Sequence, residues 1–228
     1  LIFEKASVRV CQETIYRFVY SPEGMKEDLW WYLPEHRRKR RPRKGRVPKK
    51  PKIHPDLGIA NRPKIIADRI QFGHWESDLM LFRQKFGKAN VTSLVERVSR
   101  FTVLLMNTNK TTVRVMGHLA KVMCTLPHKA RKSVTFDRGS EFMDWPHLQA
   151  EVGTQTWFCD PSAPWQKGTV ENTNRRARRW LPREVDPTTI SNHHLEMICA
   201  RLNATPRKCL GWKTPAEVFK EKVLDQTA

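Results

Sequence analysis

Three carboxylates in this 228-residue sequence have the type and placement of metal ligands. Asp78 lies within a predicted strand and precedes Leu79 and Met80, Asp137 follows the run Ser-Val-Thr-Phe, and Glu171 lies near the start of an Arg-rich stretch. A carboxylate left unpaired inside an apolar strand is costly, and Mg²⁺ or Mn²⁺ would supply a partner for such hard oxygen ligands. Two such ions can flank a scissile phosphate and stabilise both the attacking and the leaving oxygens. The pattern therefore favours metal-dependent phosphoryl transfer.

A less specific interpretation of the same acids stays open. The chain has 23 Asp and Glu residues, so three of them near strand ends are no rarity. Glu171 could instead pair with Arg175 or Arg178 on the surface of one helix, and such an exposed pair contributes well under ~1 kcal/mol. Glu76 shares a strand face with Asp78, where it either supports a metal site or pairs with a nearby Arg.

The acids need a sheet to bring them together, and the apolar patterning predicts one. The expected elements are strands over 74–82, 91–98, 101–106, 132–137 and 154–159, and helices over 111–126, 168–181 and 193–202. Three strands in a row followed by alternation with helices indicate an α/β fold with a sheet of mixed direction. Ends of neighbouring strands meet at one edge of such a sheet, so we expect Asp78 and Asp137 to converge there.

Two short helices are expected near the beginning of the chain. Apolar residues at i, i+3 and i+4 predict the first over 13–20, and a Ser-Pro-Glu-Gly turn at 21–24 separates it from a second over 25–33. Such a pair is typical of the end of a helix-turn-helix module. Thr14 and Arg17 lie one turn apart, at the margin of the apolar stripe and away from it, so we expect them to contact base edges of DNA.

The charge of the chain points to a polyanionic partner. Lys and Arg number 42 against 23 Asp and Glu, a net charge of +19, well above the roughly 2 to 8 that keeps a small domain soluble. Eleven of these cations fall within 37–52 together with three Pro, which predicts an extended arm. The arm is either a plain linker or one that also contacts DNA phosphates, and we favour phosphate contacts by Arg37, Arg38, Lys39, Arg40 and Arg41.

Other classes of protein find little support in the sequence. No run approaches the ~20 apolar residues of a membrane span, and no secretory signal is visible, so we expect a cytoplasmic protein without a membrane partner. The five Cys are widely spaced and form no C-x-x-C pair, which favours free thiols over a disulfide scaffold or zinc site. The first residue is Leu rather than Met, so we expect the chain to begin inside a longer protein.

Several segments together resemble one known family. They are GHWESD (73–78), LVERVSRF (94–101), TFDRGSEF (135–142), FCDPSAPWQKGTVENTNRRARRWLP (158–182), LNATPRKCLGWKTPAEVF (202–219) and ETIYRFVY (13–20). In order and spacing they are similar to the transposases of bacterial insertion sequences, in particular the family numbered thirty. The 33 residues between Asp137 and Glu171 match the spacing of that family's acidic residues.

The resemblance implies a ribonuclease H-like five-stranded sheet with flanking helices, preceded by a short helical DNA-binding segment. It implies boundaries at 1–34 for that segment, 35–66 for the basic arm and 67–228 for the catalytic domain. Carried over residue by residue, the acidic triad that binds Mg²⁺ or Mn²⁺ is Asp78, Asp137 and Glu171, and the expected DNA contacts near it are Lys167, Arg175 and Arg178.

The implied activity is DNA transposition, with integration and recombination of an insertion sequence. Water would cut a strand, and the freed 3′-hydroxyl would attack target DNA. The implied partners are double-stranded transposon ends and target DNA, bound by a homo-oligomer at the bacterial nucleoid. Two alternatives stay open: a metal-dependent nuclease or integrase of the same fold, and a catalytically silent DNA-binding fragment.

Overall fold

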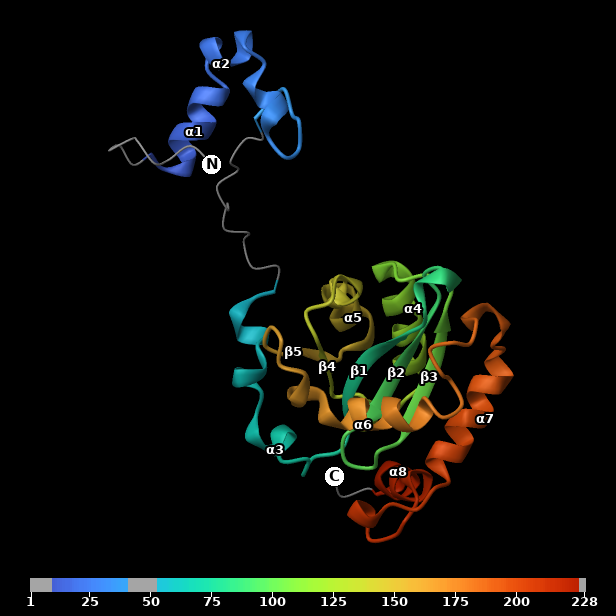
Figure 1. Ribbon diagram of the computed structural model, residues 1–228. Helices are drawn as coiled ribbons and strands as arrows, with labels where there is room; N and C mark the ends of the chain where they lie inside the picture. Colours follow the sequence, from blue (N-terminus) through green and yellow to red (C-terminus); the bar gives the residue numbers. More distant parts are fainter. Residues whose placement is uncertain (1–9, 41–52, 226–228) are drawn as a thin grey trace. The chain divides into compact units, whose positions relative to one another are not determined.

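The computed structural model describes residues 10–40 and 53–225 (Figure 1). Contacts divide the chain into two compact units, residues 1–50 and residues 51–228. Residues 41–52 of the predicted basic arm, including Arg41, lie outside the described residues. Residues 55–66, which the resemblance assigns to the arm, contain two short 3₁₀ turns and most of helix α3 (Lys64–Ala67), and Ile66 is buried in the second unit.

The first unit contains two short α-helices and a 3₁₀ turn. Helix α1 spans Gln12–Val19, α2 spans Pro22–Lys26, and the turn spans Leu29–Tyr32. The predicted first helix is confirmed. The prediction of a second helix over 25–33 is wrong, because α2 begins earlier and ends before the turn.

Local chemistry explains this difference. Ser21 caps α2, its Oγ accepting a hydrogen bond of 3.2 Å from the Gly24 N–H, and Pro22 occupies the first helical position, where its missing N–H costs nothing. Ser-Pro therefore starts a helix here rather than ending one. Asp28 then adopts a left-handed backbone with φ 51°, which interrupts the helix before Leu29.

The second unit is built on a five-stranded mixed sheet (Figure 1). Its strands are β1 (His74–Leu81), β2 (Asn90–Glu96), β3 (Thr102–Asn107), β4 (Ser133–Phe136) and β5 (Gln155–Phe158), in the order β3-β2-β1-β4-β5. The first three strands pair antiparallel, whereas β4 lies parallel to β1 and β5 parallel to β4. The predicted α/β class and mixed direction are confirmed.

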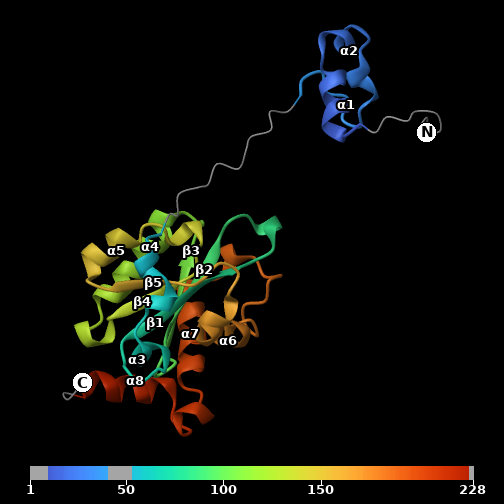
Figure 2. The same ribbon diagram turned by 90° about the vertical axis from the view of Figure 1, so that its left-hand side faces the viewer.

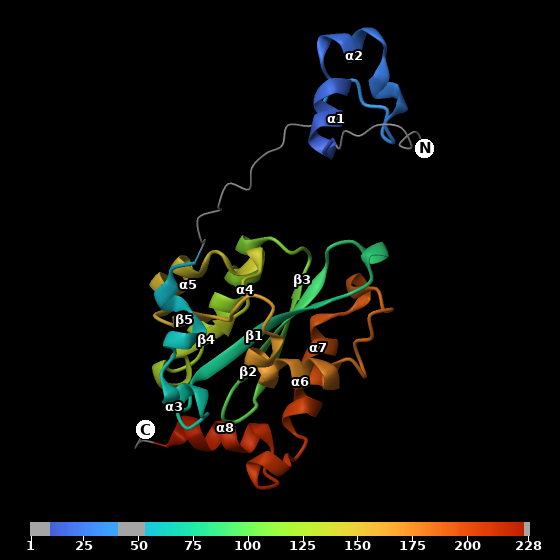
Figure 3. The same cartoon turned by 60° about the vertical axis from the view of Figure 1, so that its left-hand side comes forward.

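Helices cover both faces of the sheet. They are α4 (Thr112–Cys124), α5 (Trp145–Val152), α6 (Gly168–Ala177), α7 (Asn192–Asn203) and α8 (Pro215–Leu224). Figures 2 and 3 show α4 and α5 on one face, with α6 and α7 on the other. No helix in the described ranges 10–40 and 53–225 is long and apolar enough to cross a membrane.

Alternation along the central strand produces two cores. Trp75 on one face of β1 is fully buried in a cluster beneath α4 and α5, whereas Met80 on the other face is buried beneath α6 and α7. Asp78 and Glu76 share the face of Met80, so both point toward α6. The two carboxylates of β1 therefore both lie against α6.

Helix α8 was not predicted, and α6 is shorter than expected. Thr214 and Glu217 form a reciprocal capping box at the start of α8, with Pro215 at its first position. Phe219 of this helix stacks on Phe101 with 4.3 Å between the ring centroids, which closes the core near the start of β1. Helix α6 ends at Ala177 rather than near residue 181.

Candidate active site

The three predicted metal ligands line one cavity of about 420 Å³. Asp78 lies in the second half of β1, Asp137 directly follows β4, and Glu171 lies in the first turn of α6. Because β1 and β4 are parallel neighbours, they run toward the same edge of the sheet. Residues distant in the sequence are thus collected in one place.

A glycine turn positions Asp137. The Gly139 N–H donates a hydrogen bond of 2.8 Å to Asp137 Oδ1. A Cβ atom at position 139 would lie 2.8 Å from that oxygen and 2.7 Å from the Glu141 carboxyl carbon, so a larger residue would force the carboxylates of Asp137 and Glu141 to shift. The Asp-Arg-Gly sequence therefore fixes the orientation of the carboxylate.

The ammonium of Lys167 lies between the two aspartates. Its Nζ donates to Asp78 Oδ1 at 3.0 Å and to Asp137 Oδ2 at 2.9 Å, and also to the Ser77 carbonyl at 3.2 Å. The side chain is only 5% exposed. Burial lowers the pKa of Lys167, but the two carboxylates outweigh burial and the pKa is raised above its ordinary value.

Helix α6 supplies a second partner that sequence reasoning missed. Asn174 Nδ2 donates a hydrogen bond of 2.8 Å to Asp78 Oδ2, so both oxygens of Asp78 accept from α6 or its flank. The available signal was spacing, because Asn174 lies one helical turn after Glu171 and so shares its face.

Glu171 is exposed in the same cavity and forms no ion pair with any residue in the described ranges. Its pKa is raised, first by desolvation and then by the charge of Asp78. The alternative partners are engaged elsewhere. Arg175 donates to Asn172 Oδ1 at 3.1 Å, and Arg178 donates to the carbonyls of Leu181 and Leu81.

A buried ion pair anchors the start of α6. Glu76 is fully buried and pairs with Arg97 through Oε1, while its Oε2 accepts the N–H groups of Thr169 and Val170 at 2.9 Å each. Of the two roles considered for Glu76, the ion pair with an arginine is confirmed. Glu76 also ties the helix that carries Glu171 to β1.

Asp78 and Asp137 share one cationic nitrogen, the ammonium of Lys167. Among the residues that the structure describes, no three Asp, Glu, His or Cys side chains come together closely enough to bind a metal ion. Lys167 Nζ lies where Asp78 and Asp137 converge. Two carboxylates on one cation and a third in the same cavity are the hard oxygen donors that Mg²⁺ or Mn²⁺ prefers.

The predicted DNA contacts occupy varied surroundings. Thr14 and Arg17 are exposed on α1, and Arg175 is exposed on α6. The described part of the arm folds back, because Arg37 pairs with Glu35 at 2.7 Å and Arg40 pairs with Glu13. Arg38 and Lys39 are exposed, Arg41 lies outside the described residues, and Lys167 is buried among the carboxylates.

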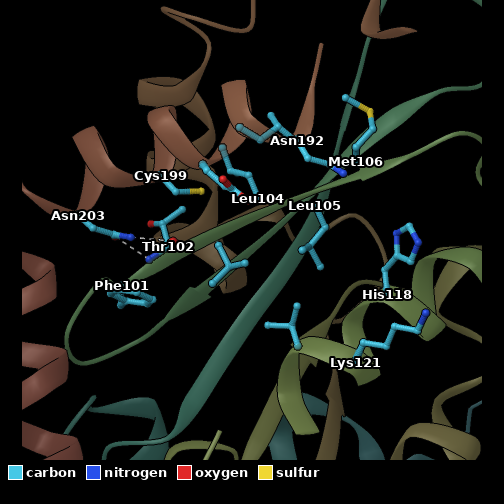
Figure 4. A pocket seen from close by; sticks show the side chains of 14 residues that line it. Phe101, Thr102, Leu104, Leu105, Met106, His118, Lys121, Asn192, Cys199 and Asn203 are labelled. Atoms are coloured by element: carbon cyan, nitrogen blue, oxygen red, sulfur yellow. Dashed lines mark hydrogen bonds between the residues drawn. The ribbon is translucent and has the colours of Figure 1, made fainter. Parts of the chain in front are cut away.

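A larger cavity, about 470 Å³, lies away from the acids between β3, α4 and α7 (Figure 4). Its walls are mostly apolar, and Asn203 holds one end through hydrogen bonds of 2.9 Å to both the N–H and the carbonyl of Thr102. None of the three predicted ligands lines it. The smaller cavity is therefore the candidate active site.

Sequence comparison gives relatives for nearly the whole chain. A model of the integrase core domain matches residues 68–164. The chain is 33% identical over 226 residues to the transposase of insertion sequence element IS1086 from Cupriavidus metallidurans, covering 98% of this chain and 66% of that relative. It is 34% identical over 224 residues to transposase InsI of element IS30C from Escherichia coli, covering 95% and 57%. The chain thus spans less than two thirds of the length of these relatives.

The fold has a solved counterpart. The catalytic core domain of BIV integrase matches with a TM-score of 0.50 and 19% identity over 65% of this chain and 94% of that domain. Sheet, helices and family match define a ribonuclease H-like integrase core, as expected. Within that class, the chain belongs to the family numbered thirty of bacterial insertion-sequence transposases.

Proposed function

We propose that the protein is a transposase that cuts DNA strands and transfers them in a metal-dependent reaction. The observation that carries the proposal is the convergence of Asp78 and Asp137 on one cation, with Glu171 in the same cavity. The similarity to insertion-sequence transposases supports DNA as the substrate of that cavity.

Asp78, Asp137 and Glu171 would hold the metal, Mg²⁺ or Mn²⁺, with two ions as the expected number. When bound, such ions stabilise charge on the attacking and leaving oxygens of a phosphodiester. Lys167 shares the two aspartates, so its ammonium has to leave them when an ion binds there. Free of the carboxylates, this cation would pair with a phosphate oxygen of DNA at the same cavity.

The chain's own contribution is positioning. Glu76 fixes the start of α6, Gly139 orients Asp137, and Asn174 orients Asp78. In the proposed sequence, water attacks one phosphodiester and releases a 3′-hydroxyl. That hydroxyl then attacks a phosphodiester of target DNA, so one P–O bond forms as another breaks and no covalent enzyme intermediate is needed.

DNA binding would be shared between the two units. A net charge of +19 favours a polyanion, and the proposed contacts are Thr14, Arg17, the cations 37–41, Lys167, Arg175 and Arg178. We propose that a homo-oligomer holds the two transposon ends and the target duplex, which places the protein on the bacterial nucleoid in the cytoplasm.

The decisive experiment is a cleavage assay on a labelled duplex that carries the ends of the element, with and without Mg²⁺. We expect cutting and strand transfer by the unmodified chain. Glu171→Gln should lower the rate at least ~100-fold, since a metal at the scissile phosphate contributes several kcal/mol. The matched control is Glu196→Gln, which removes an exposed carboxylate from α7.

The outcomes separate the alternatives. Cutting without strand transfer would indicate a nuclease of the same fold, and binding without cutting would indicate a silent DNA-binding protein. A Glu171→Gln variant that cuts at the rate of the control would remove Glu171 from the active site.

A further inference from the structure

A second cavity, of about 230 Å³, lies against the opposite face of α6. Thr169, Asn172, Thr173 and Arg176 of α6 line it, whereas Glu171 lines the acidic cavity. At 3.6 residues per turn these two sets lie on opposite sides of the helix. We call this second cavity the arginine pocket.

Four guanidinium groups line the arginine pocket, and no carboxylate does. Arg69 follows α3, Arg100 lies in the turn between β2 and β3, Arg176 belongs to α6, and Arg207 follows α7. Within the described ranges none of the four forms an ion pair with an acid. Residues distant in the sequence thus bring like charges together. Their repulsion costs free energy, which an anionic ligand in the cavity would offset.

Polar contacts hold the arginines in place. Arg69 Nη2 and Arg100 Nη1 both donate to Thr169 Oγ1, at 3.3 and 3.2 Å. Arg207 is only 7% exposed, and its Nη2 donates to the Leu202 carbonyl at 3.0 Å. Its buried Nε has no hydrogen-bond partner in the structure. Neutral oxygens rather than carboxylates thus orient Arg69, Arg100 and Arg207, which leaves their positive charge available to an acceptor-rich ligand in the cavity.

Glu76, which binds the start of α6, is not free to neutralise these arginines. Both oxygens of Glu76 are engaged, one by Arg97 and the other by the first N–H groups of α6. Burial lowers the pKa of Arg97 to about 10, with Glu76 opposing this and Arg62, Arg69 and Arg100 adding to it. The region therefore has an excess of positive charge.

We propose that the arginine pocket binds a backbone phosphate of DNA, as an anchor separate from the acidic cavity. Guanidinium forks match the paired oxygens of a phosphodiester, and Arg69 and Asn172 are exposed at the rim, where a duplex can reach them. The tail segment 202–219 thereby gains a function, because it contributes Arg207. This proposal rests on the proposed function only in taking DNA as the partner.

The first test measures duplex binding in EDTA, where no cutting occurs, as a function of salt. Arg69→Gln combined with Arg176→Gln should weaken binding about tenfold near 0.1 M salt and flatten the log–log salt slope by about 1. The control, Arg114→Gln combined with Arg201→Gln, removes two exposed arginines of α4 and α7. Equal binding and slope in both double variants would overturn the proposal.

The second test is disulfide crosslinking, which leaves every arginine of the pocket in place. Cys209 lines the arginine pocket and is exposed. A duplex that carries an activated mixed-disulfide tether on one backbone phosphate should exchange with the Cys209 thiol, so that a new disulfide forms as the original S–S bond breaks and its leaving thiol is released. Cys209→Ser should abolish that product. Cys124→Ser, at an exposed cysteine of α4, should leave it intact. Crosslinking that survives Cys209→Ser unchanged would place the phosphate elsewhere.

Two further outcomes separate this proposal from related ones. If inorganic phosphate raises the unfolding temperature but the Arg69→Gln, Arg176→Gln variant binds DNA like its control, the pocket takes free phosphate and the DNA assignment fails. If the unmodified chain binds no duplex at all, the proposed function fails as well. Binding by the unmodified chain with equal binding by both double variants defeats only the arginine pocket.

Discussion

The two faces of α6 meet surroundings of opposite charge. One face presents Glu171 to the acidic cavity and Asn174 to Asp78, and the other presents Arg176 to a cavity lined by arginines. Both faces belong to one ten-residue helix. Although the chain carries a large positive charge, acidic and basic side chains near the candidate active site lie on opposite sides of one helix. In the proposed arrangement, α6 separates the metal site from the phosphate site.

Glu76 holds this helix in place, and its removal should have the largest effect. Glu76→Gln leaves the guanidinium of Arg97 buried beneath α6 without its partner, which should lower the free energy of unfolding by about 3–5 kcal/mol. Urea unfolding of the purified chain measures this. Adding Arg97→Met should recover part of the loss, because no buried charge then remains. A single variant as stable as the exposed Glu196→Gln would show that the pair does not anchor α6.

A buried histidine surrounded by cations should make the unfolding free energy depend on pH. Burial lowers the pKa of His74 to about 4, and the charges of Lys132, Arg97 and Arg62 add to this. The unfolded chain, with a pKa near 6.5, binds this proton more readily. The contribution of neutral His74 is therefore complete above pH 6.5 and is lost as pH falls toward 4, up to ~3 kcal/mol.

His74→Gln tests this pH dependence. The variant keeps hydrogen-bonding groups beside Ser133 and Gln71 but cannot titrate. Its unfolding free energy should fall less than that of the unmodified chain between pH 7 and pH 4.5. Identical pH profiles would mean that other groups, and not this histidine, determine acid stability.

On the acidic face, Lys167 balances the carboxylates. Lys167→Met should lower the unfolding free energy without metal by about 1–2 kcal/mol, because Asp78 and Asp137 then repel each other. Added Mg²⁺ should stabilise this variant more than the unmodified chain, since the ion no longer competes with an ammonium. Calorimetry with and without Mg²⁺ measures the difference, with exposed Lys121→Met as control. Equal stabilisation of both chains would argue against an ion at this position.

The sequence was sufficient for those parts of the fold that depend on local patterning. Successive side chains of a strand point to opposite faces, so Trp75 and Met80 of β1 face separate cores, and the strand is predicted close to its observed bounds. Ser21 and Pro22 were misinterpreted, because the same residues can end one element or cap the next. Helix α8 carried a readable signal in its capping box, which only a search for caps would have found.

The site was predictable in its acids but not in its partners. The placement of Asp137 after a strand predicted its position at the sheet edge, whereas nothing near Lys167 in the sequence shows that its ammonium reaches Asp78. The arginine pocket was even harder to predict from the sequence. Arg69 and Arg207 approach each other only because α7 and the segment before β1 pack around the same helix, and such long-range placement leaves no periodic trace in the chain.

The smallest effect should come from Asn172→Asp, which is compared with the same change at Asn174 on the other face of α6. Asn174→Asp replaces the Nδ2 donor, 2.8 Å from Asp78 Oδ2, with a second carboxylate, and should lower the unfolding free energy by about 1–2 kcal/mol. Asn172→Asp, two residues earlier, adds the same charge beside Arg176 and Arg207. Because Asn172 is exposed, the gain there should be no more than ~0.5 kcal/mol.

The signs of these two changes in unfolding free energy, and not their sizes, test whether the two faces of α6 lie in surroundings of opposite charge. Asn172→Asp should also weaken duplex binding in EDTA, since its carboxylate competes with phosphate for the arginines. Unfolding curves of both variants at low and high salt measure the opposing shifts, and salt should reduce both by screening. If both substitutions shift stability in the same direction at low salt, the two faces of α6 do not differ in potential, and the helix does not separate a cation site from a phosphate site.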